Sequence, residues 1–237
     1  MTITVVYDNN PYDPRLQTAW GFGCLVEIGE KTILFDTGGD GVTLLRNVVT
    51  LEIEPTSIDT IVLSHVHADH TGGLTSLFAM GVRPTVYVPR SFPSDFKSRV
   101  WAYAELVEVQ QVANIANGIY STGEMGTGIV EQALVLSMTK GLAVVTGCAH
   151  PGISEIVRRA KEIGGDKIYL VLGGFHLDGA NEARIKEIIT DFRRLGVRKV
   201  APCHCTGNRA IALFREAYGE GFIQNGVGQV TEMINEE

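Results

Sequence analysis

The sequence predicts an α/β fold: a single domain over residues 1–237, with a two-layer core of β-sheet and helices on the outside. Three observations predict this fold. The chain opens with alternating, β-branched segments typical of antiparallel strands, and apolar strand-like runs then alternate with helix-like segments. This order, a hairpin followed by strand-helix units, occurs once in each half of the chain.

The first half is expected to begin with antiparallel strands and to continue with strand-helix units. A hairpin turns at Gly29-Glu30, between two runs rich in β-branched residues. The predicted strands are Thr2 to Tyr7, Gly23 to Ile28, Thr32 to Phe35, Thr60 to Ser64 and Thr85 to Pro89, and the predicted helices are Val42 to Leu51 and Gly73 to Met80. Ser94 to Leu106 is either a helix or a lid, and the strand-like pieces from Val107 to Met125 follow no regular pattern.

The second half opens with another hairpin, around Lys140-Gly141. A helix from Ile153 to Ile163 ends at Gly164-Gly165, because glycine takes up the backbone conformation that closes a helix. The predicted strands are Gln132 to Met138, Leu142 to Thr146, Ile168 to Leu172 and Lys199 to Pro202, the last two followed by helices over Asn181 to Leu195 and Asn208 to Tyr218. Gly221 to Gln224 and Gln229 to Met233 are candidates for a closing edge.

Composition narrows the class of function. The net charge is −7 and no lysine or arginine cluster occurs, so a nucleic acid is not an expected partner. No run reaches the roughly 18 uninterrupted apolar residues of a membrane span, and the first residues lack the features of a signal peptide. The four cysteines do not form a dense disulfide framework. We therefore expect a soluble cytoplasmic protein with reduced thiols, which acts on a small molecule; its oligomeric state is left open.

All the histidines follow strand-like runs. In sheets covered by helices, ligands gather at the carboxyl ends of the strands, so residues far apart in sequence can converge there. Any one of these histidines, taken alone, is as well explained as an ordinary surface or core residue, but six at such positions together indicate a site. They are His65, His67, His70, His150, His176 and His204.

The run from His65 to His70 has the spacing of a metal site. Residues two apart in a loop can aim at one point, so His65 and His67 can bind the same cation. Asp69 and His70 can then reach a second cation about 3.5–4 Å away, an arrangement that lowers the pKa of a shared water. Imidazole and carboxylate donors suit zinc first, with iron or manganese as alternatives. One or two zinc ions are therefore expected.

The residues around this run resemble the signature of the metallo-β-lactamase superfamily. The resemblance implies a four-layer αββα sandwich, and it implies the fold more firmly than the substrate. It is carried by Leu63 to Leu74, by Phe35 to Gly38 and by Val200 to Gly207. More narrowly, the chain resembles a subgroup named after a methanopterin-pathway synthase, which joins a dihydropterin to an aminobenzene ribofuranosyl phosphate. That resemblance rests on Tyr7 to Asn10, Thr146 to Ile153 and Gly173 to Leu177.

The resemblance implies roles for the donors. His65 and His67 match the ligands of the first metal, Asp69 and His70 match a pair on the second, and His204 matches the last ligand of the second metal. We also expect Asp69 to take part in catalysis.

Two departures from the superfamily pattern concern the turn after Thr146. No histidine lies between His70 and His150, although many hydrolases of the superfamily have one there, and Gly147-Cys148 stands where an aspartate often bridges two metals. We expect His150 to supply the missing ligand of the first metal. Cys148 is either a thiolate ligand or only a small buried residue, and both interpretations are open.

Other residues have paired interpretations. Asp36 either orients metal-bound histidines or caps a glycine-rich turn. Asn9 and Asn10 either contact substrate or form a turn before a proline. His176 is expected to donate a proton to a leaving group or to bind a phosphate, against the alternative of a histidine satisfied by backbone groups. Cys205, like Cys203, is expected to face away from His204 and to pack, since neighbours along an extended strand alternate in direction.

Three functions are compatible with this pattern. The main prediction is a hydrolase in which metal-bound hydroxide attacks a phosphoester, lactone or thioester, with an anionic small molecule as the expected substrate. The first alternative is a transferase that joins a dihydropterin pyrophosphate to a ribofuranosylaminobenzene phosphate, the metal holding the pyrophosphate. The second alternative is a non-catalytic ligand-binding module, against which the intact set of candidate ligands argues.

Overall fold

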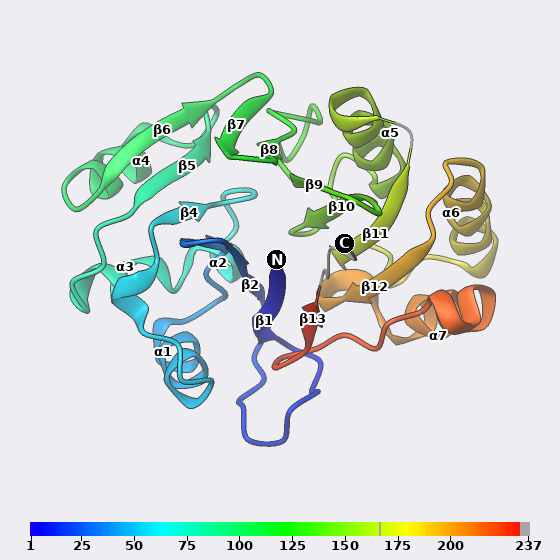
Figure 1. Cartoon of the computed structure of the whole chain (residues 1–237), viewed down its shortest axis with the longest axis horizontal. Coiled ribbons are helices and arrows are strands. Elements are labelled where there is room, and N and C mark those ends of the chain that lie inside the picture. The colour runs from blue at the N-terminus through cyan, green and yellow to red at the C-terminus, as the bar shows by residue number, and fades with distance from the viewer. Residues whose placement is uncertain (166, 233–237) are drawn as a thin grey trace. The chain divides into compact units, whose positions relative to one another are not determined.

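The computed structural model describes residues 1–165 and 167–232 and contains two β-sheets with helices packed on them (Figure 1). Most contacts between residues fall within one of two compact units. Unit 1 holds Met1–Gln110 and the segment that begins at Gly226, and unit 2 holds Gln111–Asn225. Within the described ranges, no helix combines the length and apolar character needed to cross a membrane. The single-domain organisation stays a prediction.

Unit 1 is built on a seven-stranded sheet in the order β13-β1-β2-β3-β4-β5-β6. The first four strands in this order pair antiparallel, and β3 to β6 pair parallel. The carboxyl ends of β3 and β4 therefore meet at one edge. The strands are β1 (Thr2–Asp8), β2 (Phe22–Ile28), β3 (Lys31–Phe35), β4 (Thr60–Val62), β5 (Thr85–Pro89), β6 (Glu105–Val109) and β13 (Val230–Glu232).

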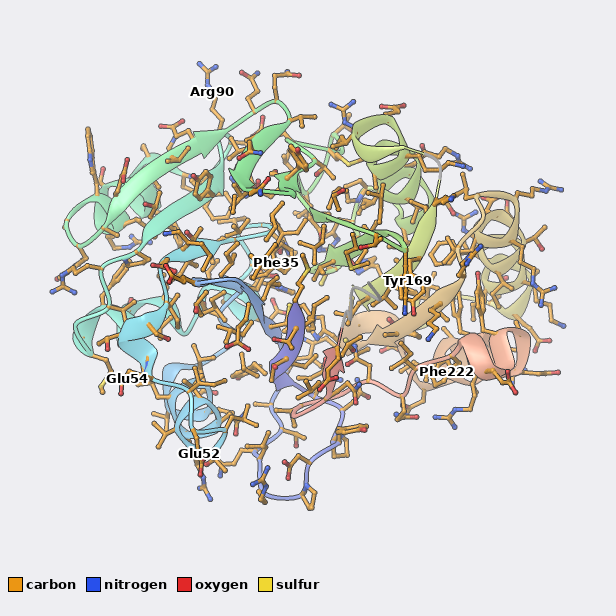
Figure 2. The ribbon with its side chains drawn as sticks, in the orientation of Figure 1. Phe35, Glu52, Glu54, Arg90, Tyr169 and Phe222 are labelled. Atoms are coloured by element: carbon orange, nitrogen blue, oxygen red, sulfur yellow. The ribbon has the colours of Figure 1, made fainter. Side chains whose placement is uncertain are left out.

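Apolar side chains from the strands and helices form the core of unit 1. Leu34 and Ile61 of the sheet belong to one buried cluster with Leu44 and Leu77 of the helices. Phe35 lies inside the unit, whereas the exposed Glu52 lies in a loop on its outside (Figure 2). The helical segments are α1 (Gly41–Thr50), η1 (Pro55–Ser57), α2 (Ala68–Thr71), α3 (Leu74–Ala79) and α4 (Ser94–Trp101).

Unit 2 repeats this change from antiparallel to parallel pairing. Its six-stranded sheet has the order β12-β11-β10-β9-β8-β7, with β7 to β10 antiparallel and β10 to β12 parallel. The carboxyl ends of β10, β11 and β12 therefore share an edge. The strands are β7 (Ala113–Ala116), β8 (Ile119–Ser121), β9 (Leu134–Met138), β10 (Gly141–Thr146), β11 (Ile168–Gly174) and β12 (Lys199–Cys203).

An aromatic cluster holds the helices of unit 2 to its sheet. The rings of Phe175, Phe192 and Phe214 have centroids 5.4 to 5.7 Å apart. At these distances aromatic rings attract one another in edge-to-face geometry. The helical segments are α5 (Ile153–Gly164), α6 (Glu182–Arg194), η2 (His204–Thr206), α7 (Asn208–Tyr218) and η3 (Gly219–Gly221).

The structure confirms the predicted α/β class and corrects several elements. The segment from Ser94 is a helix only to Trp101, after which β6 begins at Glu105. The irregular stretch that follows contains the end of β6 and the β7-β8 hairpin. The edge strand expected from Gly221 to Gln224 is wrong, because η3 ends at Gly221 and only an isolated bridge joins Phe222 to Val200. The strand expected from Gln229 is β13, and Met233 lies outside the described residues.

A close backbone approach at Gly72 yields the first prediction. A β-carbon at this position would lie 2.1 Å from the carbonyl oxygen of Gly39. Because backbone atoms move aside only at an energetic cost, we expect Gly72→Ala to lower the free energy of unfolding by about 1–3 kcal/mol. Gly128→Ala is the control, since a β-carbon there meets nothing within 4 Å. Urea unfolding of both variants measures the difference, and equal stabilities would show that the loop can yield.

Candidate metal site

A buried carboxylate organises the donor loop of unit 1. Asp36 follows β3 with a left-handed φ of 58° and no exposed surface. Its Oδ1 accepts a hydrogen bond from the backbone nitrogen of Ser64 at 2.7 Å, and its Oδ2 accepts from the Ser64 hydroxyl at 2.7 Å. Oδ2 also lies 2.7 Å from Nδ1 of His70. Asp36 therefore joins the end of β3 to both ends of the loop that follows β4, and its role in orienting metal-bound histidines stays a prediction.

These contacts assign the tautomers of His65 and His70. A carboxylate only accepts hydrogen bonds, so Nδ1 of His70 carries the proton that faces Asp36. The hydroxyl of Ser64 gives its one proton to Asp36 and so accepts from Nδ1 of His65, 2.8 Å away. In neutral rings with a proton on Nδ1, Nε2 carries the lone pair. Both buried histidines are thus prepared to coordinate a cation through Nε2.

The remaining donors of the loop lie beside these two nitrogens. His67 comes just before α2 and Asp69 lies within it, so the second half of the donor loop is a helical turn. Nε2 of His65 lies 3.1 Å from Nδ1 of His67, and Nε2 of His70 lies 3.6 Å from Oδ2 of Asp69. Ligand atoms bound to one zinc ion at about 2.0–2.1 Å in tetrahedral geometry are about 3.3–3.4 Å apart. The donor types and spacings of unit 1 therefore fit a zinc-type cation.

Unit 2 carries a second donor cluster at the shared edge of its parallel strands. Cys148 follows β10, His176 follows β11 and His204 follows β12. Candidate ligand atoms of His204, of His150 and of the pair His176 and Cys205 each lie within 4.8 Å of the Cys148 thiol. Unit 2 therefore brings together all its sequence-predicted donors, with Cys148 common to every grouping.

Glu131 fixes the turn that carries Cys148 and His150, and sequence analysis missed it. Its buried carboxylate accepts hydrogen bonds from the backbone nitrogens of Cys148, Ala149 and His150, each at 2.9 Å. Glu131 comes just before β9, which runs antiparallel to β10, so its side chain starts at the edge where β10 ends. The only signal in the sequence was an acidic residue just before a predicted strand, and this signal does not indicate which backbone groups the carboxylate contacts.

Cys205 departs from its predicted role. The strand β12 ends at Cys203, and His204 turns the chain with a left-handed φ of 49°. Strand alternation therefore stops, and Sγ of Cys205 lies 3.6 Å from the carbonyl oxygen of Cys148 instead of facing away. Hydrogen bonds with Cys148 and His176 lower the pKa of the Cys205 thiol. The same contact with Cys205 raises the pKa of His176, which favours its protonated form.

His176 and the two asparagines differ in their surroundings. His176 is the exposed member of its cluster, with its ring centroid 4.4 Å from that of His150. The backbone nitrogen and side-chain amide of Asn10 both donate to Oδ1 of Asp8, at 2.6 and 2.7 Å, as in the turn that the sequence offered as one interpretation. Asn9 is partly buried in the same segment. Substrate contact by Asn9, Asn10 and His176 stays a prediction.

The chain belongs to the metallo-β-lactamase superfamily, whose family model matches residues 24–161. The 7,8-dihydropterin-6-methyl-4-(β-D-ribofuranosyl)-aminobenzene-5'-phosphate synthase of Methanocaldococcus jannaschii is 30% identical to it, and the match covers 96% of this chain and 94% of the synthase. The predicted resemblance to the superfamily and to this synthase subgroup is confirmed.

Solved structures agree on the fold. The crystal structure of a metal-dependent hydrolase of the β-lactamase superfamily matches with a TM-score of 0.83 and 28% identity, covering 99% of this chain and 100% of that one. A diphosphatase of the PhnP family matches with a TM-score of 0.61 and 16% identity over 97% of this chain and 96% of its own, which shows the fold alone. The metallo-β-lactamase-like fold class is confirmed.

The contacts of Asp36 predict how it acts on metal binding. Asp36→Asn replaces a charged acceptor of the His70 proton by a weaker one, so we expect metal affinity to fall by about 10- to 100-fold. Ser64→Ala removes the hydroxyl that contacts both Asp36 and His65 but keeps the carboxylate beside His70, so it should weaken metal binding less. Chelator competition measures both affinities, and Asp13→Asn, whose carboxylate pairs with Arg15, is the control. Unchanged affinity in both site variants would reduce Asp36 to a turn cap.

Proposed function

We propose that the chain is a metal-dependent transferase that joins a dihydropterin diphosphate to a ribofuranosylaminobenzene phosphate. The similarity to the Methanocaldococcus jannaschii synthase carries this proposal, because it extends over nearly all of both chains. It favours the transferase over the hydrolase that was the main prediction from sequence.

The proposed ligands follow the resemblance and the two clusters. His65, His67 and His150 would hold one ion, and the other would be held by Asp69, His70, His204 and the thiolate of Cys148. The tautomers assigned to His65 and His70 support one proposed ligand of each ion. Zinc is the proposed metal, with iron or manganese as alternatives. A bound metal would supply a Lewis acid that neutralises negative charge on phosphate oxygens.

The proposed reaction breaks the bond between the methylene carbon of the dihydropterin and its diphosphate. A bond from this carbon to the aminobenzene compound forms, the acceptor loses a proton, and diphosphate leaves. Asp36 and Glu131 hold the donor loops in place during the reaction. His176 would contact the leaving diphosphate, since it is exposed at the strand edge and its contact with Cys205 raises its pKa, which favours the cationic form.

Hydrolysis is the second candidate. A structure 28% identical to the chain over almost its whole length is described as a metal-dependent hydrolase. The same donors would serve a water molecule as the nucleophile, with a phosphoester, lactone or thioester as substrate. The two reactions differ in the substrate, in the bond that breaks and in the acceptor, so their products separate them.

The transferase predicts that product formation depends on both substrates. Zinc-loaded protein is incubated with a dihydropterin diphosphate, with and without the ribofuranosylaminobenzene phosphate, and products are identified by mass spectrometry. We expect the coupled product and diphosphate only when the acceptor is present. Release of hydroxymethyl dihydropterin regardless of acceptor would instead identify a hydrolase. If the dihydropterin diphosphate is not converted with or without the acceptor, and a phosphodiester, lactone or thioester is cleaved in a parallel panel, the transferase is rejected.

Metal content separates ligands from substrate-contacting residues. His67→Ala should lose most bound metal and all activity with the fold retained, whereas Val66→Ala in the same loop should keep its metal. If the thiol is a ligand, Cys148→Ser should weaken the binding of one of the two metal ions and leave the other bound. Elemental analysis and circular dichroism measure these outcomes. Full metal content in His67→Ala would contradict the assignment.

His176→Ala should keep its metal and lose rate. A lost proton donor should lower kcat by about a hundredfold or more. A lost phosphate contact that is equally strong in ground and transition states should raise KM instead. Steady-state kinetics of the variant distinguishes these results, and loss of metal would make His176 a ligand and release His150 from that role.

A further inference from the structure

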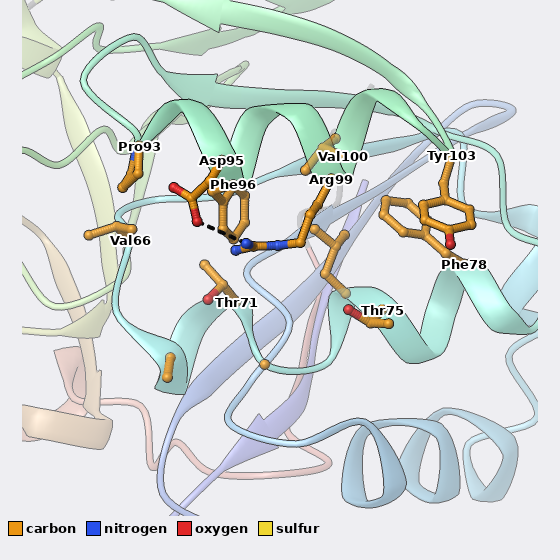
Figure 3. Close-up of a pocket in the computed structure, with 13 residues that line it drawn as sticks. Val66, Thr71, Thr75, Phe78, Pro93, Asp95, Phe96, Arg99, Val100 and Tyr103 are labelled. Carbon is orange, nitrogen blue, oxygen red and sulfur yellow. Dashed lines mark hydrogen bonds and ion pairs between the residues drawn. The ribbon is translucent and has the colours of Figure 1, made fainter.

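A cavity of about 530 Å³ in unit 1 borders the donor loop (Figure 3). It lies between α4 on one side and the segment of α2 and α3 on the other. Small-molecule sites in proteins typically measure about 300–1,000 Å³, and most of their lining is apolar. The cavity therefore has the size of a site for one small organic molecule.

Aromatic side chains form much of its wall. The rings of Phe78 and Tyr103 are stacked, with centroids 5.4 Å apart and an angle of 18° between their planes. Phe96 projects from α4 into the same cavity, with the guanidinium carbon of Arg99 5.6 Å from its ring centroid. Flat aromatic faces bind flat heteroaromatic rings by stacking, which is worth about 1–3 kcal/mol per ring for nucleobases.

The donor loop is also a wall of this cavity. His65 and Asp69 carry candidate ligand atoms, and Val66 and Ala68, which lie between them in the sequence, line the cavity. A molecule held in the cavity would thus lie against the same six-residue loop that presents the metal donors. The position suits the non-reacting part of a substrate whose reacting group is at the metal.

A polar pair completes the lining. Asp95 and Arg99 extend from α4 over the cavity and form an ion pair with an N–O distance of 2.9 Å, facing Thr71 and Thr75 (Figure 3). The hydrogen bond from Arg99 lowers the pKa of Asp95, so the carboxylate is charged at neutral pH and only accepts hydrogen bonds. Two adjacent N–H donors on the edge of a heterocycle match the two oxygens of such a carboxylate.

We propose that this cavity binds the flat, fused-ring heteroaromatic part of the substrate, an inference that rests on the proposed function. Phe96 and Tyr103 contact the faces of the ring, and the carboxylate of Asp95 accepts hydrogen bonds from its edge of N–H donors. The cavity thereby selects the substrate, while the donor loop beside it serves the reaction.

Binding of pterin to the full-length protein tests the proposal, without turnover. Fluorescence titration of metal-free and zinc-loaded protein gives the dissociation constant. We expect Tyr103→Ala and Phe96→Ala each to weaken binding by about tenfold, from the loss of one stacking contact. Trp101→Ala is the matched control, since this aromatic residue on the same helix is 76% exposed and does not line the cavity. It should change binding less than twofold.

The edge contact has its own test. Pterin presents a ring N–H and an amino group side by side, whereas lumazine has an oxygen in place of that amino group. Asp95→Asn should weaken pterin binding by about tenfold and leave lumazine binding nearly unchanged. Equal effects on both compounds, or none, would remove the proposed role of Asp95.

These results separate the cavity from the reaction. Failure of wild-type protein to bind pterin, or full affinity in both aromatic variants with their fold confirmed by circular dichroism, would overturn the cavity proposal. The product assay would still test the transferase. Conversely, pterin binding that depends on Tyr103 and Phe96, in a protein that forms no coupled product, would support the cavity and reject the transferase.

Discussion

The donor loop of unit 1 depends on the buried carboxylate of Asp36. Charged acceptors that are buried must be hydrogen-bonded, because a carboxylate left without partners in the interior costs several kcal/mol. Asp36 meets this requirement with the backbone and hydroxyl of Ser64 and the ring of His70. The same bonds that satisfy the charge fix the tautomers of His65 and His70. The same arrangement of atoms thus stabilises the strand edge and prepares the two histidines to bind a cation.

Unit 2 uses a carboxylate differently. Glu131 accepts from three consecutive backbone nitrogens and so fixes the path of the chain through Cys148 and His150 without touching the ligand side chains through these bonds. Loss of a buried acceptor would leave these backbone donors without their partner, at a cost of about 1–3 kcal/mol each. The carboxylate of Asp36 orients imidazole rings, whereas that of Glu131 orients a backbone turn. Both carboxylates act at the carboxyl ends of parallel strands.

The fold by itself does not choose the reaction, since one scaffold can carry many chemistries. The relatives illustrate this, one being a synthase and another described as a hydrolase. In this chain α4 and the residue Tyr103 add an aromatic wall against Val66 and Ala68.

Local patterns in the sequence determined the strands, most helices and the histidines at their ends, because backbone periodicity and residue type act over a few neighbours. They did not place β6 to β8, whose short, partly exposed strands show no clean alternation. Nor did they predict the side chain of Cys205, since the left-handed turn at His204 ends the alternation that a strand would impose. Ser64 and Glu131 were missed for one reason: their partners lie 28 and 17 to 19 residues away, and only the pairing of strands within each sheet brings them together.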